Sequence, residues 1–448
     1  MRARMIKMIK LSLVFLSALL ARAAATPIDT ATDTIDDTLI TLANPPLTNA
    51  SIPVRSLGTL ALSAPGFAAV IPQEGSNTLF VSSFHATGSD YVYRINNVAS
   101  ATKPAGLAGL TATKIAGSVT WPNDVVAAPK SIFGTDGVVV GGGFLVPGKG
   151  NGGLYFSPSA SGSSGSWVTL AAKSGWFYHR AVFADMDGDG VLDMVSCRAN
   201  QPLFGSASTM LVWLKPKDAT KPTGTWVETE IGAGCDALFT VADLDNSGIP
   251  EIIAASYFTK QFNLFYSNAK TGFQNKADIK KVLLDGTIGA AFDVQFVDVN
   301  GDGKKDLLVT NHQGGSDKPS GSVYAYEIPA PASMADPTAY QRHLLATGFP
   351  VTQGGLNQAS PGSPVAFYPN AANKSGAPHI AVAGDAAQIA YVLIPDPKTP
   401  WTYTTTMLHN CGCTVGKLEV ADVDGDGFAE VFVPCYDNGV LAAYSFKA

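Results

Sequence analysis

The stretch Ala184-Asp-Met-Asp-Gly-Asp-Gly-Val-Leu-Asp193 decides the fold, because its pattern occurs four times in the chain. It returns as Ala242-Asp-Leu-Asp-Asn-Ser-Gly-Ile-Pro-Glu251, as Val297-Asp-Val-Asn-Gly-Asp-Gly-Lys-Lys-Asp306 and as Ala421-Asp-Val-Asp-Gly-Asp-Gly-Phe-Ala-Glu430. A short apolar segment precedes and follows each copy, as in Met194-Val-Ser-Cys197. Recurrence of this kind indicates a protein built from one repeated structural unit.

Three further units keep the apolar segments but lose the acidic residues. Their first two segments are 67–71 with 79–82, 124–128 with 138–141, and 364–368 with 379–382. A third segment follows in all seven units, at 91–95, 153–156, 210–214, 262–266, 323–326, 389–393 and 440–444, and a fourth follows in six. A low charged fraction of 15%, with 45 glycines, suits short strands and tight turns. Four strands repeated seven times predict an all-β, seven-bladed β-propeller.

The last unit ends at Phe446 after only three strands, which would leave the edge of its sheet unpaired. Proteins normally cover such edges, because an unpaired strand can recruit other chains. The strand-like segment Val54-Arg-Ser-Leu-Gly-Thr-Leu-Ala-Leu62 precedes the first unit and is free to pair there. We therefore expect residues 53–62 to complete the last blade, with the propeller spanning residues 53–448.

The N-terminus has the pattern of a signal peptide. Basic residues precede the apolar run 11–20, and an A-x-A pattern at 23–25 offers a cleavage site. A membrane anchor is the alternative, but this run is too short to span a bilayer. We expect residues 1–25 to be removed and residues 26–52 to form an N-terminal extension. The mature protein is then expected to be a secreted monomer without a transmembrane span.

Secretion permits disulfide bonds, and the chain has five cysteines, which are Cys197, Cys235, Cys411, Cys413 and Cys435. Cys197 and Cys235 stand at adjoining ends of two successive units and could form a bridge, and Cys413 and Cys435 have a similar relation around the last unit. The odd count leaves one thiol over. A zinc site at Cys411-Gly-Cys413 is not expected, because two cysteines in this pattern are too sparse for a structural zinc site. The sequons at Asn49 and Asn373 are compatible with glycosylation on the export route.

The spacing D-x-D-x-D-G-x-x-D suits Ca²⁺, which takes about six to eight oxygen ligands. Carboxylates at positions one, three, five and nine can point inward, and glycine at position six permits the sharp turn. The expected ligands are Asp185, Asp187, Asp189 and Asp193; Asp243, Asp245, Ser247 and Glu251; Asp298, Asn300, Asp302 and Asp306; and Asp422, Asp424, Asp426 and Glu430. The loop with Ser247 lacks one carboxylate and should bind more weakly, which gives three to four structural sites.

The alternative for any single loop is a solvated acidic turn without an ion. Four copies at equivalent places favour calcium over that alternative. They also favour calcium over Mg²⁺, which demands a stricter octahedron and retains its waters. A carboxylate that binds a cation is a poor proton acceptor. We therefore expect the loops to be structural and not catalytic.

These repeats resemble the FG-GAP/VCBS family, found in integrin α-chains, fungal lectins and several secreted enzymes. The resemblance covers residues 53–446 and implies a propeller that binds calcium. It does not imply an activity, because this fold hosts many functions. Among secreted fungal propellers, the chain is similar in fold and export to aldos-2-ulose dehydratase and to hetero-Diels–Alder cyclases of secondary metabolism.

The four acidic loops join first and second strands, so they should share one face of the ring. The start of each first strand and the end of each second strand must then meet on the opposite face, around the central channel. Polar groups converging at a channel mouth are typical of a ligand site. The candidate catalytic residues there are His179, His312, Tyr257, Asp236 and Asp293. The candidate ligand-binding residues are His85, Asp124, Arg180, Arg198, Lys417 and Tyr436, with Phe144, Tyr178, Asn200, Asp385 and Asp437 at equivalent positions. The alternative is that some of these groups only form ion pairs with each other, such as Arg180 or Lys417 with Asp236 or Asp293.

Two classes of function fit this arrangement. One is a lyase- or cyclase-type enzyme, because a proton donor and acceptor in a partly dry cup suit dehydration or cyclisation. A Ser-His-Asp elbow, a phosphate loop and a dinucleotide fingerprint are absent from the sequence, so we expect neither hydrolysis nor an organic cofactor. The other class is a carbohydrate-binding or adhesion propeller, like a lectin or an integrin head. The candidate residues differ from blade to blade, which favours one small-molecule ligand. A net charge of −6 without a basic stripe argues against nucleic acid as the partner.

Overall fold

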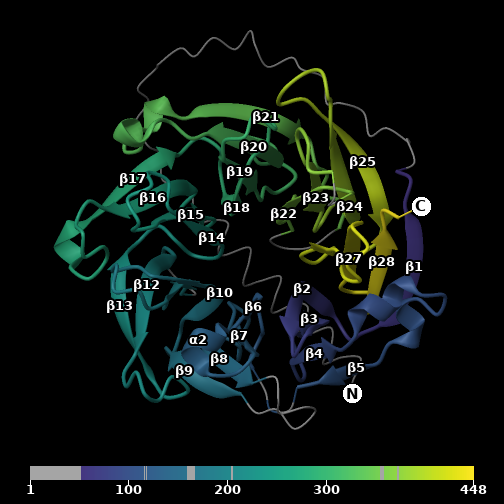
Figure 1. The fold of residues 1–448 in the computed structure, drawn as a ribbon, viewed down its shortest axis with the longest axis horizontal. Coiled ribbons are helices and arrows are strands. Elements are labelled where there is room, and N and C mark those ends of the chain that lie inside the picture. Colours follow the sequence, from purple (N-terminus) through teal and green to yellow (C-terminus); the bar gives the residue numbers. More distant parts are fainter. Residues whose placement is uncertain are drawn as a thin grey trace.

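Seven four-stranded antiparallel sheets surround one axis in the computed structural model, as Figure 1 shows. The structure describes residues 52–115, 117, 119–158, 167–202, 205–353, 358–370 and 373–447. The first strand of each blade lies nearest the axis, and the fourth lies at the rim. The predicted seven-bladed propeller is therefore confirmed.

The strands follow the predicted order along the chain. Blade 1 contains β2 (Pro65–Gln73), β3 (Ser76–Ser83), β4 (Tyr91–Ile95) and β5 (Ala112–Lys114), and blade 2 contains β6 (Val125–Ala127), β7 (Gly137–Gly141), β8 (Gly153–Pro158) and β9 (Val168–Ala172). Blade 3 contains β10 (Phe177–Ala184), β11 (Asp193–Asn200), β12 (Ser208–Pro216) and β13 (Trp226–Gly232), and blade 4 contains β14 (Phe239–Ala242), β15 (Glu251–Ser256), β16 (Gln261–Ser267) and β17 (Ile279–Asp285). Blade 5 contains β18 (Ala291–Val297), β19 (Asp306–Asn311), β20 (Ser322–Glu327) and β21 (Gln341–Thr347), and blade 6 contains β22 (Pro364–Phe367), β23 (His379–Ala383), β24 (Ile389–Pro395) and β25 (Tyr403–Asn410). Blade 7 contains β26 (Glu419–Ala421), β27 (Glu430–Cys435), β28 (Val440–Ser445) and β1 (Arg55–Ala61).

Burial changes from the second strand to the fourth. Every residue of β7, β15, β19 and β27 is buried, because a second strand lies between two neighbouring blades and packs on both faces. Continuous runs of Val, Ile, Leu and Ala suit such strands. The fourth strands β13 and β17 contain buried, partly buried and exposed residues instead, since one side faces solvent.

A β-bulge recurs in the fourth strand of six blades. In blade 4, Phe262 pairs with Asp285 while Asn263 pairs with Leu283, which leaves Leu284 as the extra residue. The equivalent extra residues in blades 2, 3, 5, 6 and 7 are Leu170, Ile231, Leu345, Leu408 and Leu57. All except the partly buried Leu408 are at most 6% exposed. The bulge thus turns one apolar side chain of each outer strand into the core.

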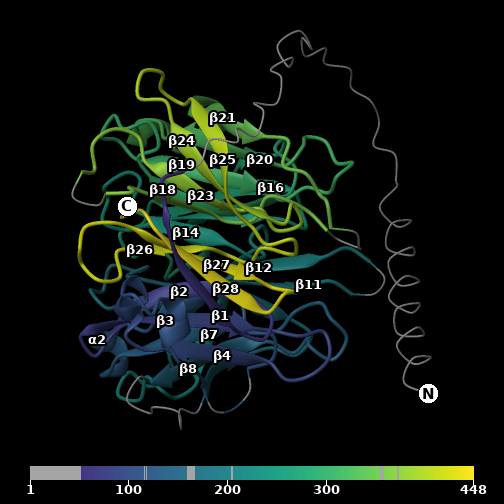
Figure 2. The same cartoon turned by 90° about the vertical axis from the view of Figure 1, so that its right-hand side faces the viewer.

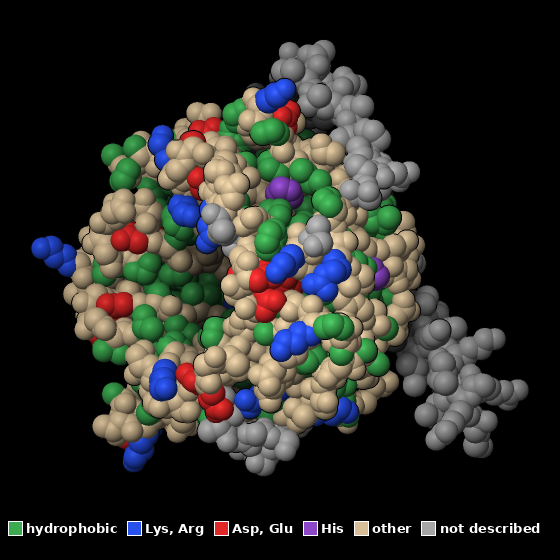
Figure 3. All heavy atoms as spheres, turned by 45° about the vertical axis from the view of Figure 1, so that its right-hand side comes forward, with side chains coloured by type: hydrophobic (Ala, Val, Ile, Leu, Met, Phe, Trp, Pro, Cys, Tyr) green, Lys and Arg blue, Asp and Glu red, His purple; other side chains and the backbone are tan. Residues whose placement is uncertain are grey.

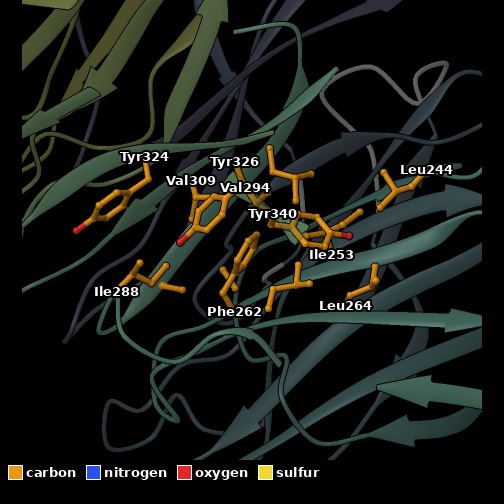
Figure 4. Close-up of a cluster of buried hydrophobic side chains, with 14 of the residues drawn as sticks. Leu244, Ile253, Phe262, Leu264, Ile288, Val294, Val309, Tyr324, Tyr326 and Tyr340 are labelled. Atoms are coloured by element: carbon orange, nitrogen blue, oxygen red, sulfur yellow. The ribbon is translucent and has the colours of Figure 1, made fainter. Parts of the chain in front are cut away.

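The hydrophobic cores lie between blades. Each of the seven clusters of buried side chains combines residues from two successive blades. Figure 4 shows the cluster between blades 4 and 5, where Ile253, Phe262 and Leu264 meet Val309 and Tyr326. A single blade therefore has no core of its own, and each depends on its neighbours.

The last blade is closed by β1, as predicted. Strand β1 pairs antiparallel with β28, with Leu60 opposite Leu441 and Ala61 opposite Val440. Figure 2 shows β1 alongside β28, although the two strands lie at opposite ends of the described chain. Leu57 is 3% exposed and joins the core between blades 7 and 1.

Two disulfides also connect neighbouring blades. Cys197 within β11 is joined to Cys235 before β14, so this bridge links blades 3 and 4. The second bridge joins Cys411 to Cys435, and Cys413 is a buried free thiol. The alternative pairing of Cys413 with Cys435 is therefore wrong, because the chain directly after β25 places the Cα atom of Cys411 5.4 Å from that of Cys435.

The two disulfides indicate an oxidising, extracellular or secretory compartment. The expected signal peptide and nearly all of the expected extension lie outside the described residues. Among the described helices, none combines the length and the apolar character that a bilayer span requires.

Leu57→Ala should lower the free energy of unfolding by about 2–4 kcal/mol, because it leaves a cavity where β1 closes the ring. Thr59→Ala, at an exposed position of the same strand, is the matched control and should change it by less than about 0.5 kcal/mol. Urea denaturation of both variants measures the difference. Equal midpoints would contradict a closing role for β1.

Candidate functional site

The four acidic loops connect β10 with β11, β14 with β15, β18 with β19, and β26 with β27. Each loop joins the first and second strands of its blade, so all four open on one face of the ring. We call this the loop face.

Position one of each acidic loop organises the turn. In the loop 298–306, Asp298 Oδ1 accepts a hydrogen bond from the N–H of Gly301 (2.7 Å), and Oδ2 accepts one from Gly303 (2.8 Å). The same contacts join Asp185 to Gly188 and Gly190, and Asp422 to Gly425 and Gly427. In the loop 243–251, Asp243 Oδ2 likewise accepts a hydrogen bond from Gly248, whereas Oδ1 accepts one from Ser247 at position five. The carboxylate at position one thus orders the turn in all four loops.

Position nine is buried in all four loops. Asp193, Glu251, Asp306 and Glu430 are at most 3% exposed. Each accepts a hydrogen bond from the backbone N–H at position two of its own loop. Burial raises the pKa of Asp193 to about 6 and the pKa of the other three to about 7. These carboxylates are poorly solvated, so a nearby positive charge would stabilise their ionised form.

In three of the four acidic loops, the carboxylate oxygens converge closely enough for a metal ion. One oxygen from each member lies within 4.8 Å of the others in three triads, which are Asp185, Asp187 and Asp193; Asp243, Asp245 and Glu251; and Asp422, Asp424 and Glu430. Two ligands of one Ca²⁺, each about 2.4 Å from it, lie within about 4.8 Å of one another. The all-oxygen triads are therefore consistent with calcium sites.

Position two of each acidic loop inserts into the next blade. Met186, Leu244, Val299 and Val423 occupy this position and are at most 7% exposed. The carbonyl of Met186 accepts a hydrogen bond from the N–H of Phe273 in blade 4 (2.9 Å), and the carbonyl of Val299 accepts one from the hydroxyl of Tyr403 in blade 6 (2.7 Å). Figure 4 shows Leu244 at one end of the cluster between blades 4 and 5. The conformation of each acidic loop thus affects the packing of two blades.

Aromatic rings on the opposite face form a continuous chain of contacts. Successive ring centroids lie 4.5–6.3 Å apart along Tyr436, Phe84, Trp121, Phe144, Phe177, Phe258, Tyr257, His312 and Phe292. We call these nine residues the aromatic arc. It passes through blades 7, 1, 2, 3, 4 and 5 in order. Trp121 and Phe177 are buried, whereas the other seven are only partly buried.

Polar groups of blade 6 lie beside His312 of the arc. His312 Nε2 lies 3.6 Å from Asp385 Oδ2, and His312 Nδ1 lies 2.9 Å from the carbonyl oxygen of Pro361. Because only a protonated Nδ1 can bond this carbonyl, Nε2 of the neutral ring is left as a proton acceptor. Burial raises the pKa of Asp385 and of Tyr257 above their ordinary values. His312, next to the last ring of the arc, is thus a group able to accept a proton.

An ion network joins blades 2, 3, 5 and 7 across the axis. Arg180 Nε donates to Asp124 Oδ2 (2.6 Å), and Arg180 Nη1 donates to Asp293 Oδ1 (2.8 Å). Lys417 Nζ donates to Asp124 Oδ1 (2.7 Å). Burial alone would raise the pKa of Asp124, but Lys417 and Arg180 hold it well below its ordinary value. Burial raises the pKa of the neighbouring Glu419 to about 7. The charged candidates of blades 2, 3, 5 and 7 therefore neutralise one another.

His179 lies next to this ion network. Its ring is 6% exposed and lies edge-on to Phe67, with centroids 5.1 Å apart. Burial lowers the pKa of His179 to about 4. The ring is thus neutral at physiological pH and covered by its surroundings.

Two other predicted residues are fully buried. Asp236 is 0% exposed and accepts hydrogen bonds from the N–H groups of Tyr257 and Phe258 (2.9 Å each), and burial raises its pKa to about 6. It holds the turn that presents Tyr257. Arg198 is also 0% exposed, and Glu228 (3.0 Å) and Glu230 of β13 bind its guanidinium. Arg198 therefore does not line an open cup, contrary to expectation, because the outer strand of its own blade engages it.

The remaining two ligand-binding candidates stand on the arc or beside it. Tyr436 donates its hydroxyl hydrogen to the carbonyl of Phe84 (2.7 Å). His85 Nε2 lies 2.8 Å from Ser63 Oγ, but its Nδ1 is 3.9 Å from Asp90. That separation exceeds a hydrogen bond, so these three groups do not complete a Ser-His-Asp triad.

Sequence reasoning missed five rings of the arc, which are Phe84, Trp121, Phe177, Phe258 and Phe292. Four of them stand directly beside a predicted residue, as Phe84 does beside His85. The signal that could have found them is an aromatic side chain next to the polar residue at the end of a second strand or the start of a first strand.

Charged side chains on the face in Figure 3 are dispersed, with basic and acidic groups interspersed. A hollow beside Lys217, Asp218 and Lys221 lies on the turn between β12 and β13, which opens on the loop face. It contains neither aromatic side chains nor buried ionisable groups, so the arc is the better candidate for a ligand.

Comparison with known proteins supports the repeat. The FG-GAP-like repeat model matches residues 212–309. No curated protein matches the chain. The chain is similar to an α-L-arabinofuranosidase from Fusarium graminearum bound to an iminosugar inhibitor, with 9% identity, coverage of 87% of this chain and 97% of that one, and a TM-score of 0.45. It is also similar to a soluble aldose sugar dehydrogenase from Escherichia coli (8% identity, 88% and 99% coverage, TM-score 0.38) and to the Dos1 propeller (10% identity, 88% and 95% coverage, TM-score 0.44).

Burial of the neutral His179 ring should lower the free energy of unfolding as the pH falls from 6.5 to about 4. In this interval the unfolded state binds a proton that the native state excludes, because the native pKa is lowered. The stabilising contribution of the neutral ring is complete above pH 6.5 and is lost as the pH approaches 4. His179→Gln should reduce this decline by on the order of 3 kcal/mol in urea denaturation across the pH series. Parallel pH profiles of the variant and the wild type would contradict the assignment.

Proposed function

Because the chain is a seven-bladed β-propeller that contains an FG-GAP-like repeat, we propose that it is an exported, calcium-stabilised protein that binds an uncharged small molecule. The ligand would occupy the cup, which we define as the aromatic arc with Asp385, above the ion network of Asp124, Arg180, Asp293 and Lys417. The continuity of the arc through six blades carries the proposal.

Calcium binding is supported by the chemistry of the acidic loops. The carboxylate triads of three loops converge within the span that one ion requires, and all four loops contain a buried acid at position nine. Bound Ca²⁺ would neutralise these clustered carboxylates, which otherwise repel one another. Because position two inserts into the next blade, an ordered loop would also fix the contact between blades.

The cup favours an uncharged ligand with flat apolar faces. Half-buried rings such as Phe84, Phe144 and Phe258 offer surfaces for stacking. The nearby cations Arg180 and Lys417 are already paired with carboxylates, so they do not attract an anion strongly. Polar partners for hydroxyl groups remain at Asp437 and Gln353, whose side chains bond each other at 3.1 Å. A sugar, which combines apolar ring faces with hydroxyl groups, fits this lining best.

Turnover of the ligand is a second candidate function, favoured by the position of His312. Its Nε2 faces the cup as a proton acceptor, with Tyr257 and Asp385 beside it. Elimination of water needs one group to take a proton from carbon and another to give a proton to the departing hydroxyl. His312 with Tyr257 or Asp385 could supply both, which suits lyase- or cyclase-type chemistry. Asp236, Asp293 and His179 are less suited to touch a substrate, because they are buried.

Removing calcium should lower the melting temperature of the purified mature protein. If calcium is present at about one hundred times its dissociation constant, each site contributes about 2.7 kcal/mol to stability, and chelation removes that contribution. Differential scanning calorimetry with and without EGTA measures the effect. Asp298→Asn should make the fall in melting temperature on adding EGTA smaller. Ca²⁺ added in excess should reverse the effect of the chelator. An unchanged melting temperature would contradict calcium stabilisation.

Phe144→Ala should weaken carbohydrate binding roughly tenfold, because it removes one stacking surface from the arc. A glycan array screens for ligands, and titration calorimetry with the best ligand measures the change. Tyr368→Ala is the matched control, since it removes a half-buried ring that follows β22 on the loop face. Equal losses in both variants, or binding that survives Phe144→Ala, would contradict the cup.

His312→Gln separates binding from turnover. If the protein is a lyase or cyclase, this variant should lose product formation, followed by NMR on the bound sugars and on metabolite extracts, while retaining ligand affinity. Carbohydrate binding by the wild type without any turnover would instead show a binding or adhesion module.

A further inference from the structure

A lysine side chain lies within the acidic loop of blade 3. Lys215, in β12, places Nζ 2.7 Å from Asp187 Oδ2 and 2.8 Å from Asp189 Oδ2. Asp193 Oδ1 is 3.4 Å from the same nitrogen. These carboxylates occupy positions three, five and nine, which are the positions expected to bind the metal. The ammonium group therefore lies among the oxygens that would surround an ion.

The ammonium group fits this place chemically. It has three N–H donors, and three carboxylates face it. Asp185, at position one, is engaged separately, because its oxygens accept hydrogen bonds from Gly188 and Gly190. Each of the four acidic side chains of the loop thus has at least one partner without a metal, and Asp187 Oδ1 is left buried without a hydrogen-bond partner.

Calcium among these oxygens would lie close to a like charge. Asp187 and Asp193 are buried, so water screens the repulsion less than it would at an open surface. Lys215 would have to leave the carboxylates before an ion could take its place. The loop 185–193 therefore fits a lysine better than it fits calcium.

The other acidic loops have different neighbours in the third strand. In blade 5, Glu327 stands opposite Asp306 and adds a carboxylate. In blade 7, Ser445 Oγ donates to Glu430 Oε1 (2.7 Å). In blade 4, the pairing of Ile252 with Phe265 places Tyr266 opposite Glu251. A lysine at this third-strand position thus distinguishes blade 3 from these three blades.

Lys447 is the informative comparison. It contacts the loop 422–430 through Asp426 at 3.0 Å, and its side chain is 51% exposed. Among the described ion pairs it touches one carboxylate, whereas Lys215 touches three. Lys447 can therefore move into solvent without leaving a cage of acids unpartnered.

We propose that Lys215 is the built-in cation of the loop 185–193, which is ordered without calcium. The loops 243–251, 298–306 and 422–430 bind calcium instead, and this inference rests on the proposed calcium binding of those three loops. The loop 185–193 inserts Met186 between blades 3 and 4, and the Cys197–Cys235 disulfide joins the same two blades. Removal of calcium would therefore loosen the other acidic junctions while the junction of blades 3 and 4 stays closed.

Calcium stoichiometry of the purified mature protein tests the proposal. Equilibrium dialysis with ⁴⁵Ca²⁺ should show one more ion per chain in Lys215→Met than in the wild type. Lys447→Met is the matched control and should leave the number unchanged. Adding Asp187→Asn to Lys215→Met should remove the extra ion, because it takes away one of the freed ligands.

Terbium luminescence locates the extra ion. The ring of Trp213 lies 5.3 Å from Lys215 Nζ, so Tb³⁺ bound in this loop would receive energy from that tryptophan. Emission excited through tryptophan should rise in Lys215→Met and fall again when Trp213→Phe is added. In the wild type, Trp213→Phe should leave the emission unchanged.

Terbium emission from the wild type that disappears in Trp213→Phe would overturn the proposal, even if Lys215→Met failed to fold. Equal stoichiometry in the wild type and a folded Lys215→Met would also overturn it. Absence of any bound calcium in both proteins would overturn the wider calcium proposal as well. The proposal for Lys215 would be supported if the wild type bound three calcium ions and its terbium emission did not depend on Trp213.

Discussion

The packing of each second strand between two neighbouring blades is the constraint on which this structure depends. Strands such as β15 and β19 are buried on both faces, so a blade without its neighbours would expose a fully apolar sheet. The seven cores accordingly lie between blades, and the ring must close for the first and last of them to form. Closure by β1 and the two interblade disulfides serve this one requirement.

The acidic loops belong to the same system of contacts. Their position-nine carboxylates are buried at the inner turn, and their position-two side chains pack into the following blade. Charge and packing are therefore coupled, because the loop that orders the carboxylates also delivers an apolar residue to the interface. Blade 2 also inserts an apolar residue into the interface with the next blade, but it does so without an acidic loop. Its helix α2 (Lys130–Phe133) carries Phe133 against Phe156 and Trp226, so the insertion does not depend on acidic residues.

On the opposite face, the charged groups stabilise each other more than they offer themselves to a ligand. Asp124, Asp293, Arg180 and Lys417 form one network across the axis, and Asp236 holds a turn. The aromatic arc shares no residue with this network, and His312, next to its last ring Phe292, lies beside the acid Asp385. The charged groups that stabilise the ring are thus different residues from those of the proposed ligand site.

The sequence by itself determined the number of blades, the order of their strands, the closing strand near residues 53–62 and the conformation of the acidic loops. Each of these follows from local pattern, because apolar periodicity and the D-x-D-x-D-G spacing specify strands and turns within a few residues. Only the tertiary structure decided which candidates meet. Arg180 pairs with Asp293 across 113 positions, and Lys417 pairs with Asp124 across 293. Lys215 enters its own acidic loop from the third strand, and Cys435 pairs with Cys411 and not with Cys413. Such partners depend on the side-chain direction and separation set by ring closure, which a repeated sequence pattern does not encode.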